Sequence, residues 1–215
     1  MSLTVDFAIR RDQVLHYLEA VSRAEKGLRR SQTASDVARV NVLRAGTFLI
    51  MYNLVEASLR SSVEAIHDSI VSQAVPFQNL RESIRRDVMR SFKNKIDPDV
   101  QKNMIDVPVQ LVAVALDLTA GYPFSGNVDS RKIRDVADIY GFEIVANPEH
   151  REGADLLTIK TARNDLAHGL KTYEEVGRDY TTSDVKALAE RSLGYVEAVL
   201  RGVDGFLAAR GFEAP

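Results

Sequence analysis

The chain has 215 residues, of which 45% are hydrophobic and 27% are charged, a composition typical of a water-soluble globular protein. Its formal net charge of -2 excludes the overall positive charge that drives non-specific nucleic-acid binding, so any RNA or DNA contact must come from a local patch. Because the sequence contains no cysteine, disulfide frameworks, thiolate zinc sites and a cysteine nucleophile are excluded as well.

The sequence also carries no targeting signal that we can identify. The first residues, MSLTVDFAIRRDQ, lack the apolar core of a signal peptide. The longest strictly apolar run, LVAVAL at 111–116, is too short to cross a bilayer. We therefore expect a cytoplasmic protein that does not insert into a membrane.

Three helices are predicted in the first half of the chain. Residues 6–30 place apolar side chains three, four and seven positions apart, which is typical of a helix with one buried stripe. A longer apolar pattern runs without proline over 34–75 and predicts one long helix or two nearly collinear ones, with Thr33 as N-cap and Asp36 three residues later. Residues 78–95 predict a third helix, whose apolar face is surrounded by arginine and lysine.

The middle of the chain is predicted to be less regular. Residues 98–118 are apolar on most sides, and Pro108 is expected to begin or kink a buried helix there. The stretch TAGYPFSGNVDS, at about 119–130, is rich in Gly, Pro, Ser and Asn and predicts a loop or arm.

Helices are predicted again toward the C-terminus. The sequence SRKIRDVADIYGF, at 130–142, predicts a short helix that ends at Gly141. Residues 142–150, FEIVANPEH, are the segment in which a short β-strand is the alternative to helix or loop. Residues 153–168 are predicted to be helical, and TTSD at 181–184 predicts the cap of a final helix that keeps its apolar face to about position 209.

These patterns predict an all-α fold. Long antiparallel helices would form one helical bundle, with an extended loop region at about 119–130. No internal repeat or low-complexity tract interrupts the sequence, so we expect a single domain over residues 1–215.

An arginine interrupts the apolar face of the helix predicted over 153–168. In the sequence TARNDLAHGLKTYEEVG, which starts at position 161, Arg163 occupies a seam position where an apolar residue is expected. A guanidinium there needs an anionic partner or an opening to water, because an unpaired buried charge costs on the order of several kcal/mol. A salt bridge to a carboxylate on a neighbouring helix is the simplest structural explanation. The rest of this face consists of Leu156, Ile159, Leu166 and Leu170.

His168 follows Arg163 by five residues. The two side chains are about 140° apart around an ideal helix, so they cannot converge within one unbroken helix. Gly169 offers one route to convergence, since a glycine there ends the helix and frees the imidazole from its register. A two-fold axis offers another, because it can bring the arginine of one subunit beside the histidine of the other. Asn164, on the same face as His168, is placed to orient the imidazole or to contact a ligand, whereas the structural alternative for the histidine is a helix cap.

The string RNDLAHG, followed by YEEVGRDYTTSDV, resembles the signature of the HEPN superfamily (higher eukaryotes and prokaryotes nucleotide-binding). FLIMYNLVEASLR (48–60) and FSGNVDSRKIRDVADIYGF (124–142) resemble companion segments of a HEPN group found with toxin-antitoxin and phage-defence genes. The resemblance implies a helical bundle that dimerises with its motifs facing each other and cleaves RNA without a metal or other cofactor. It implies catalytic roles for Arg163, Asn164 and His168. Some HEPN toxins carry a modifiable tyrosine two residues after the histidine, and here that position is Leu170.

The residue types suit this reaction. RNA supplies its own nucleophile, the 2′-hydroxyl, so cleavage without a metal needs a base, an acid for the leaving 5′-oxygen and a cation for the transition state. Histidine serves both proton roles near neutral pH, and arginine stays charged and can grip two phosphate oxygens. A dimer would bring two histidines and two arginines into one cleft. The products would carry a 2′,3′-cyclic phosphate and a 5′-hydroxyl.

Other residues are candidates for supporting roles. Asn53 and Glu56 lie close to the apolar stripe of the long helix and are expected to hydrogen-bond the motif, with ordinary solvation as the alternative. Tyr173, just after the motif, is expected to close the cleft or to anchor a loop. The helix predicted over 78–95 carries arginines that would bind RNA phosphates or form only a solvated face: Arg85, Arg86 and Arg90.

We therefore predict a homodimeric HEPN endoribonuclease that acts as the toxin or effector of a bacterial defence or stress system. Its substrate would be RNA, its partner in regulation an antitoxin or a second HEPN protein, and its site would need no metal or cofactor. The alternative is a non-catalytic HEPN module, antitoxin-like or a nucleotide-binding adaptor, in which Arg163 and His168 serve an interface. DNA binding through residues 81–95 is a third hypothesis.

Overall fold

The computed structural model describes residues 3–31, 33–95, 112, 115–116 and 127–214. Its α-helices are α1 (Leu3–Ser31), α2 (Ala34–Ser72), α3 (Glu82–Lys95), α6 (Ser130–Tyr140), α7 (Asp155–Ala167), α8 (Tyr173–Arg178) and α9 (Thr182–Ala208). Two 3-10 helices, η1 (Phe77–Asn79) and η3 (Pro148–Gly153), lie between them. In the described part of the chain, β-pairing is limited to an isolated bridge between Leu80 and Glu213. The all-α prediction is confirmed, including the absence of a strand over 142–147.

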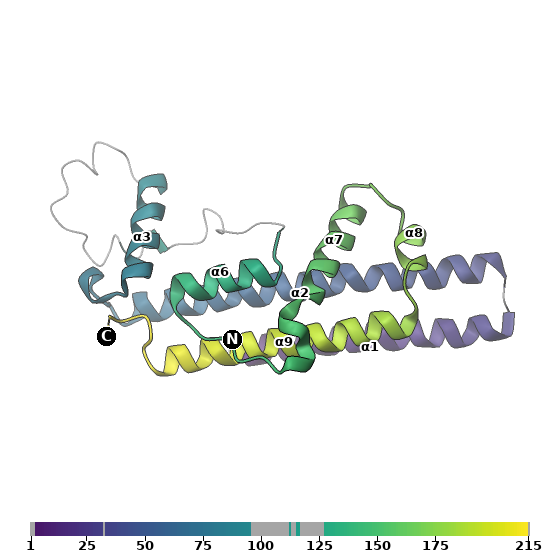
Figure 1. Cartoon of the computed structure of the whole chain (residues 1–215), viewed down its shortest axis with the longest axis horizontal. Helices are drawn as coiled ribbons and strands as arrows, with labels where there is room; N and C mark the ends of the chain where they lie inside the picture. Colours follow the sequence, from purple (N-terminus) through teal and green to yellow (C-terminus); the bar gives the residue numbers. More distant parts are fainter. Residues whose placement is uncertain (1–2, 32, 96–111, 113–114, 117–126, 215) are drawn as a thin grey trace.

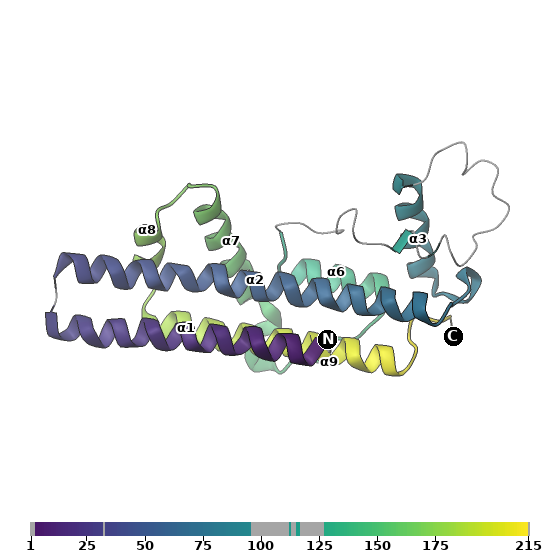
Figure 2. The same cartoon turned by 180° about the vertical axis from the view of Figure 1, so that it is seen from behind.

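The three longest helices form the frame of the molecule. α1 and α2 lie side by side and antiparallel, and α9 packs against both, extending past the N-terminus of α1 (Figures 1 and 2). α6, α8 and the C-terminal part of α7 project on the other side of α2 (Figures 1 and 2). α2 is therefore covered by helices on both sides.

The sequence of α2 explains its length. The Thr33 hydroxyl accepts a hydrogen bond from the Asp36 N–H at 3.1 Å, which confirms the predicted N-cap, and a single helix of 39 residues follows. By length and composition alone α2 could cross a membrane, but half of its apolar window is buried against other helices, as in the core helix of a soluble bundle. The cytoplasmic location stays a prediction. The helix and loop predicted over 98–118 and 119–130 lie almost wholly outside the described residues.

An ion pair with a buried carboxylate fixes the start of α7 on α9. Asp155, the first residue of α7, is buried and accepts hydrogen bonds from Arg191 of α9 through Nε at 2.5 Å and Nη2 at 3.1 Å. Arg151 approaches the same carboxylate at 3.4 Å. Such a two-pronged arginine–carboxylate pair sets orientation as well as distance, so α7 leaves the bundle in a defined direction.

Close backbone contact fixes α8 on α2. A capping box between Thr172 and Glu175 begins α8, and Gly177 then faces α2. A Cβ on Gly177 would collide with the backbone carbonyl of Asn41. The glycine therefore allows α8 to approach α2, and the segment between α7 and α8 is held at both ends.

Replacing Gly177 with alanine is expected to destabilise the protein by roughly 1–3 kcal/mol, because the backbone of α2 has to move to admit the methyl group. Urea unfolding followed by circular dichroism measures the change. Gly27→Ala is the matched control, since a Cβ on this helical glycine of α1 meets nothing within 4 Å. We expect the control to be neutral or stabilising by up to about 1 kcal/mol. Equal unfolding midpoints for the two variants would contradict this account of α8.

Candidate functional site

Arg163 fills its seam position by stacking on an aromatic ring. Its guanidinium carbon lies 4.5 Å from the centre of the Tyr52 ring of α2, and its Nη1 donates a hydrogen bond to the Asn164 Oδ1 at 2.9 Å. Among the described residues no carboxylate forms an ion pair with Arg163, and the side chain is only half-buried. The simple explanation by a salt bridge is therefore wrong within the described residues. A cation–π contact supports the charge while the guanidinium stays open to water.

Tyr52 is the supporting residue that the sequence prediction missed. Its side chain is fully buried, and its hydroxyl accepts a hydrogen bond from the Val128 N–H at 3.1 Å. Burial raises the pKa of Tyr52, and the negative charge of the nearby Glu56 raises it further, against the opposing effects of Val128 and Arg163. The phenol therefore stays neutral and fixed beneath the guanidinium. A tyrosine within the apolar stripe of α2 was the one signal available in the sequence.

The residues predicted to support the motif are placed differently from one another. Glu56 reaches the motif through Tyr52, and it also pairs with Arg60 at 3.7 Å. Asn53 is exposed and makes no hydrogen bond to the motif within the described ranges. Tyr173 begins α8 and lies near Tyr17 of α1. Burial raises the pKa of Tyr17, and Tyr173 raises it further. Neither Asn53 nor Tyr173 contacts Arg163 or His168 in the described part of one chain.

His168 stands at the end of α7, where its N–H still donates the helical hydrogen bond to the Asn164 carbonyl at 3.0 Å. α7 ends at Ala167, His168 occupies the C-cap, and Gly169 has a φ of +66°. The Leu170 N–H donates to the Asp165 carbonyl at 2.8 Å and the Gly169 N–H donates to the Leu166 carbonyl at 3.3 Å, which is the Schellman pattern. The prediction that Gly169 ends the helix is confirmed. His168 is exposed, and its imidazole makes no hydrogen bond to any described residue.

The same turn corrects the position predicted for Leu170. Leu170 was placed in the buried seam, but it is 73% exposed, because the chain has changed direction at Gly169. Leu157, on the solvent side of α7, is also 54% exposed. Two large apolar side chains therefore lie exposed, Leu157 near the start of α7 and Leu170 just beyond its end.

Asn164 was expected to orient the imidazole or to contact a ligand. Instead its side-chain oxygen holds the Arg163 guanidinium. One turn earlier, Lys160 forms an ion pair with Asp129, the N-cap of α6. Burial pulls the Asp129 pKa upward, but hydrogen bonds from Lys160 and from the Lys132 N–H outweigh it, so the pKa is lowered overall. Lys160 is thus neutralised locally, whereas Arg163 is not.

The basic helix α3 lies far from this motif. In both views α3 stands at one end of the molecule, beyond α6, while α7 rises from its middle (Figures 1 and 2). Arg86 pairs with Glu82 at 2.5 Å and Arg90 with Asp87 at 3.7 Å, and Arg85 is half-buried. Within one chain, the three arginines proposed to bind RNA therefore do not adjoin Arg163 and His168, and two of them already have acidic partners.

Replacing Tyr52 with phenylalanine is expected to destabilise the protein by roughly 1–3 kcal/mol, because the buried Val128 N–H loses its acceptor. The ring remains, so the stack with Arg163 is kept. Urea unfolding gives the free energy, and Tyr173→Phe, at a 40% exposed tyrosine, is the matched control with an expected change within about 0.5 kcal/mol. A neutral Tyr52→Phe would show that the hydroxyl does not hold Val128 in solution.

The arrangement presents two chemically active groups. A half-exposed guanidinium can bind an anion such as a phosphate, and an exposed imidazole can accept or donate a proton. No group of three or more His, Asp or Glu side chains suited to a metal ion occurs among the residues that the structure describes. The two side chains leave α7 in different directions, so their cooperation on one phosphate needs a second surface.

Comparison with known proteins identifies the family. A family model described as HEPN_MAE_28990-like HEPN matches residues 1–211, which includes every helix described above. No curated protein and no solved structure matches the chain. The match covers nearly the whole sequence and includes the Arg163–His168 motif on α7. The chain therefore belongs to the HEPN superfamily, as a member of its HEPN_MAE_28990-like family.

Proposed function

We propose that this HEPN protein is a metal-independent endoribonuclease. One observation carries the proposal: in the described part of the chain, Arg163 and His168 are left without acidic partners, although arginines and lysines close by are paired. A guanidinium that stacks on a ring and stays open to water is suited to bind a phosphate. HEPN membership is compatible with such an activity.

In this proposal each residue has one task. His168 removes the proton from the RNA 2′-hydroxyl, whose oxygen attacks the adjacent phosphorus, and a second histidine protonates the leaving 5′-oxygen. Arg163 stabilises the negative charge that grows on the phosphate oxygens. Asn164 and Tyr52 position the guanidinium through its hydrogen bond and its stacked face. The second histidine comes from a second copy of the chain.

A homodimer through α7 is part of the proposal. Leu170 provides exposed apolar surface two residues after His168, and a two-fold axis there would bury it. It would also bring His168 of one subunit toward Arg163 of the other. The role as toxin or effector of a defence or stress system rests on the resemblance to HEPN groups found with such genes.

The test is cleavage of total RNA by the purified protein in the presence of EDTA. We expect fragments that end in a 2′,3′-cyclic phosphate and begin with a 5′-hydroxyl, because the nucleophile belongs to the RNA. End-specific ligation or mass spectrometry identifies these ends. The absence of cleavage, or fragments with 5′-phosphates, would reject the proposal.

The exposed leucines also suit a second function. A non-catalytic HEPN module, antitoxin-like or an adaptor, would use Leu157 and Leu170 for a protein partner. Expression in a bacterial host separates the two functions. Growth arrest that depends on His168 supports the nuclease, whereas harmless expression that protects against a toxic neighbouring gene supports the module.

A further inference from the structure

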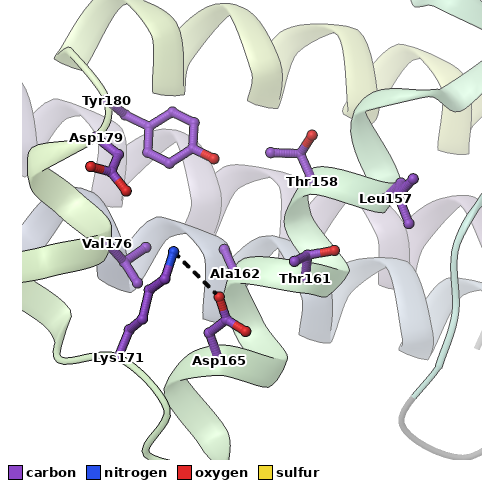
Figure 3. Close-up of a pocket in the computed structure, with 9 residues that line it drawn as sticks. All are labelled: Leu157, Thr158, Thr161, Ala162, Asp165, Lys171, Val176, Asp179 and Tyr180. Atoms are coloured by element: carbon purple, nitrogen blue, oxygen red, sulfur yellow. Dashed lines mark ion pairs between the residues drawn. The ribbon is translucent and has the colours of Figure 1, made fainter.

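A cavity of about 340 Å³ lies between α7 and the segment that joins α8 to α9 (Figure 3). Thr158 and Asp165 line it from α7, and Lys171, Asp179 and Tyr180 line it from the other side. The volume lies at the lower end of the range for small-molecule sites.

The cavity holds one ion pair and several polar groups that have no partner among the described residues. The Lys171 Nζ and an Asp165 carboxylate oxygen are 3.6 Å apart, across one side of the cavity (Figure 3). No described residue hydrogen-bonds the side chains of Thr158, Asp179 or Tyr180, and Figure 3 shows the Tyr180 hydroxyl directed toward Thr158. Burial and the Asp179 carboxylate raise the pKa of Tyr180, so its hydroxyl keeps its proton. The cavity thus offers a free carboxylate, two free hydroxyls and an ammonium to a ligand.

The remaining walls suit a flat ring. The Tyr180 ring packs on Phe48 of α2, with 4.9 Å between the ring centres, so it is held from behind. Leu157, Ala162 and Val176 supply apolar lining. A planar heterocycle can contact these apolar groups while its edges meet the polar ones, which is how proteins bind unstacked bases of single-stranded RNA.

We propose that this cavity is a guanine-binding subsite for one base of the RNA substrate, an inference that rests on the proposed ribonuclease function. Guanine carries two adjacent donors, N1–H and the 2-amino group, which match the two oxygens of the Asp179 carboxylate. Its O6 and N7 are acceptors and match the Lys171 ammonium. Adenine, cytosine and uracil each lack the pair of adjacent donors.

The cavity adjoins the turn that presents His168. The Asp165 side chain lines the cavity, while the Asp165 carbonyl accepts the N–H groups of Leu170 at 2.8 Å and of Lys171 at 3.3 Å. These hydrogen bonds join the cavity wall directly to the turn that follows His168. An RNA strand passing His168 can therefore place a neighbouring base in the cavity while the cut phosphate lies at the motif.

Binding of the four nucleoside 5′-monophosphates to the His168→Ala protein tests the subsite without cleavage. Isothermal titration calorimetry is expected to show GMP bound about tenfold or more tightly than AMP, CMP or UMP, since one good base-specific contact discriminates to this degree. Asp179→Asn is expected to remove the preference for GMP. Lys171→Gln is expected to weaken the binding of GMP but not that of the other three nucleotides. Asp204→Asn, at an exposed position of α9, is the matched control with unchanged binding. Thermal melting of each variant verifies the fold.

The outcomes separate this inference from the proposed function. Equal affinity for the four nucleotides, or unchanged GMP binding by Asp179→Asn, overturns the subsite whatever RNA cleavage shows. Selective GMP binding by a protein whose wild type cuts no RNA supports the subsite and rejects the ribonuclease. When both hold, wild-type cuts are expected to have guanosine at one fixed position beside the cut, and Asp179→Asn to cut without that preference.

Discussion

Replacing His168 with alanine is expected to lower the rate of RNA cleavage by about two to four orders of magnitude, the contribution typical of a general acid or base. The fold should be unaffected, because the imidazole is exposed and has no hydrogen-bond partner among the described residues. Initial rates on a fluorescently labelled RNA measure the loss. Thermal melting of the same samples shows whether the loss reflects the chemistry alone.

His16→Ala is the matched control for this substitution. His16 is also an exposed helical histidine, but it lies on α1 and outside the motif. We expect its cleavage rate to equal that of the wild type. Comparable losses in the two variants would mean that the assay reports the stability of the protein. Undiminished cleavage by His168→Ala would rule out catalysis by this histidine.

Much of the fold was predictable because its signals are local. Thr33 and Thr181 accept hydrogen bonds from backbone N–H groups three residues later, so a short stretch of sequence defines where α2 and α9 begin. Gly141 directly after α6, and Gly169 after the C-cap residue of α7, adopt positive φ angles, a conformation that glycine adopts without a steric cost. Helix positions therefore follow from neighbours along the chain.

The residue on which the Arg163 guanidinium packs was not predictable in the same way. The apolar pattern identified an arginine out of place, but its partner lies on α2, far away in sequence, and that partner is a ring instead of a carboxylate. A charge in an apolar seam is compatible with either partner, because both offset the cost of burial. Only the packing of α7 on α2 decides between them.

The position of the basic helix α3 was not predictable from the sequence either. The sequence correctly predicted a helix with arginines around it, and α3 is that helix. Its position at the end of the molecule depends on the turn through η1 and on its packing against α6, neither of which is encoded in the charge pattern. The charge pattern does not say how far this helix lies from the motif, and within one chain α3 and α7 are apart.

Mixing two inactive variants tests whether the proposed site is shared between subunits. Arg163→Ala and His168→Ala are each expected to be nearly inactive alone. Co-expressed with different tags and purified through both, the pair is expected to cleave RNA about tenfold or more faster than either parent, because the mixed dimer keeps one arginine beside one histidine. It is expected to stay slower than the wild type, because water must replace the missing second histidine as the acid. Native mass spectrometry verifies that the mixed dimer has formed.

The geometry of α7 is the reason to expect this recovery. Arg163 extends toward Tyr52 of α2, whereas His168 is exposed at the C-terminal end of the helix, so one subunit presents its guanidinium and its imidazole to different surroundings. A mixed dimer joined by two-fold symmetry would bring the intact arginine of one chain beside the intact histidine of the other. A verified mixed dimer that is no faster than either parent would contradict a site in which the arginine of one subunit acts beside the histidine of the other.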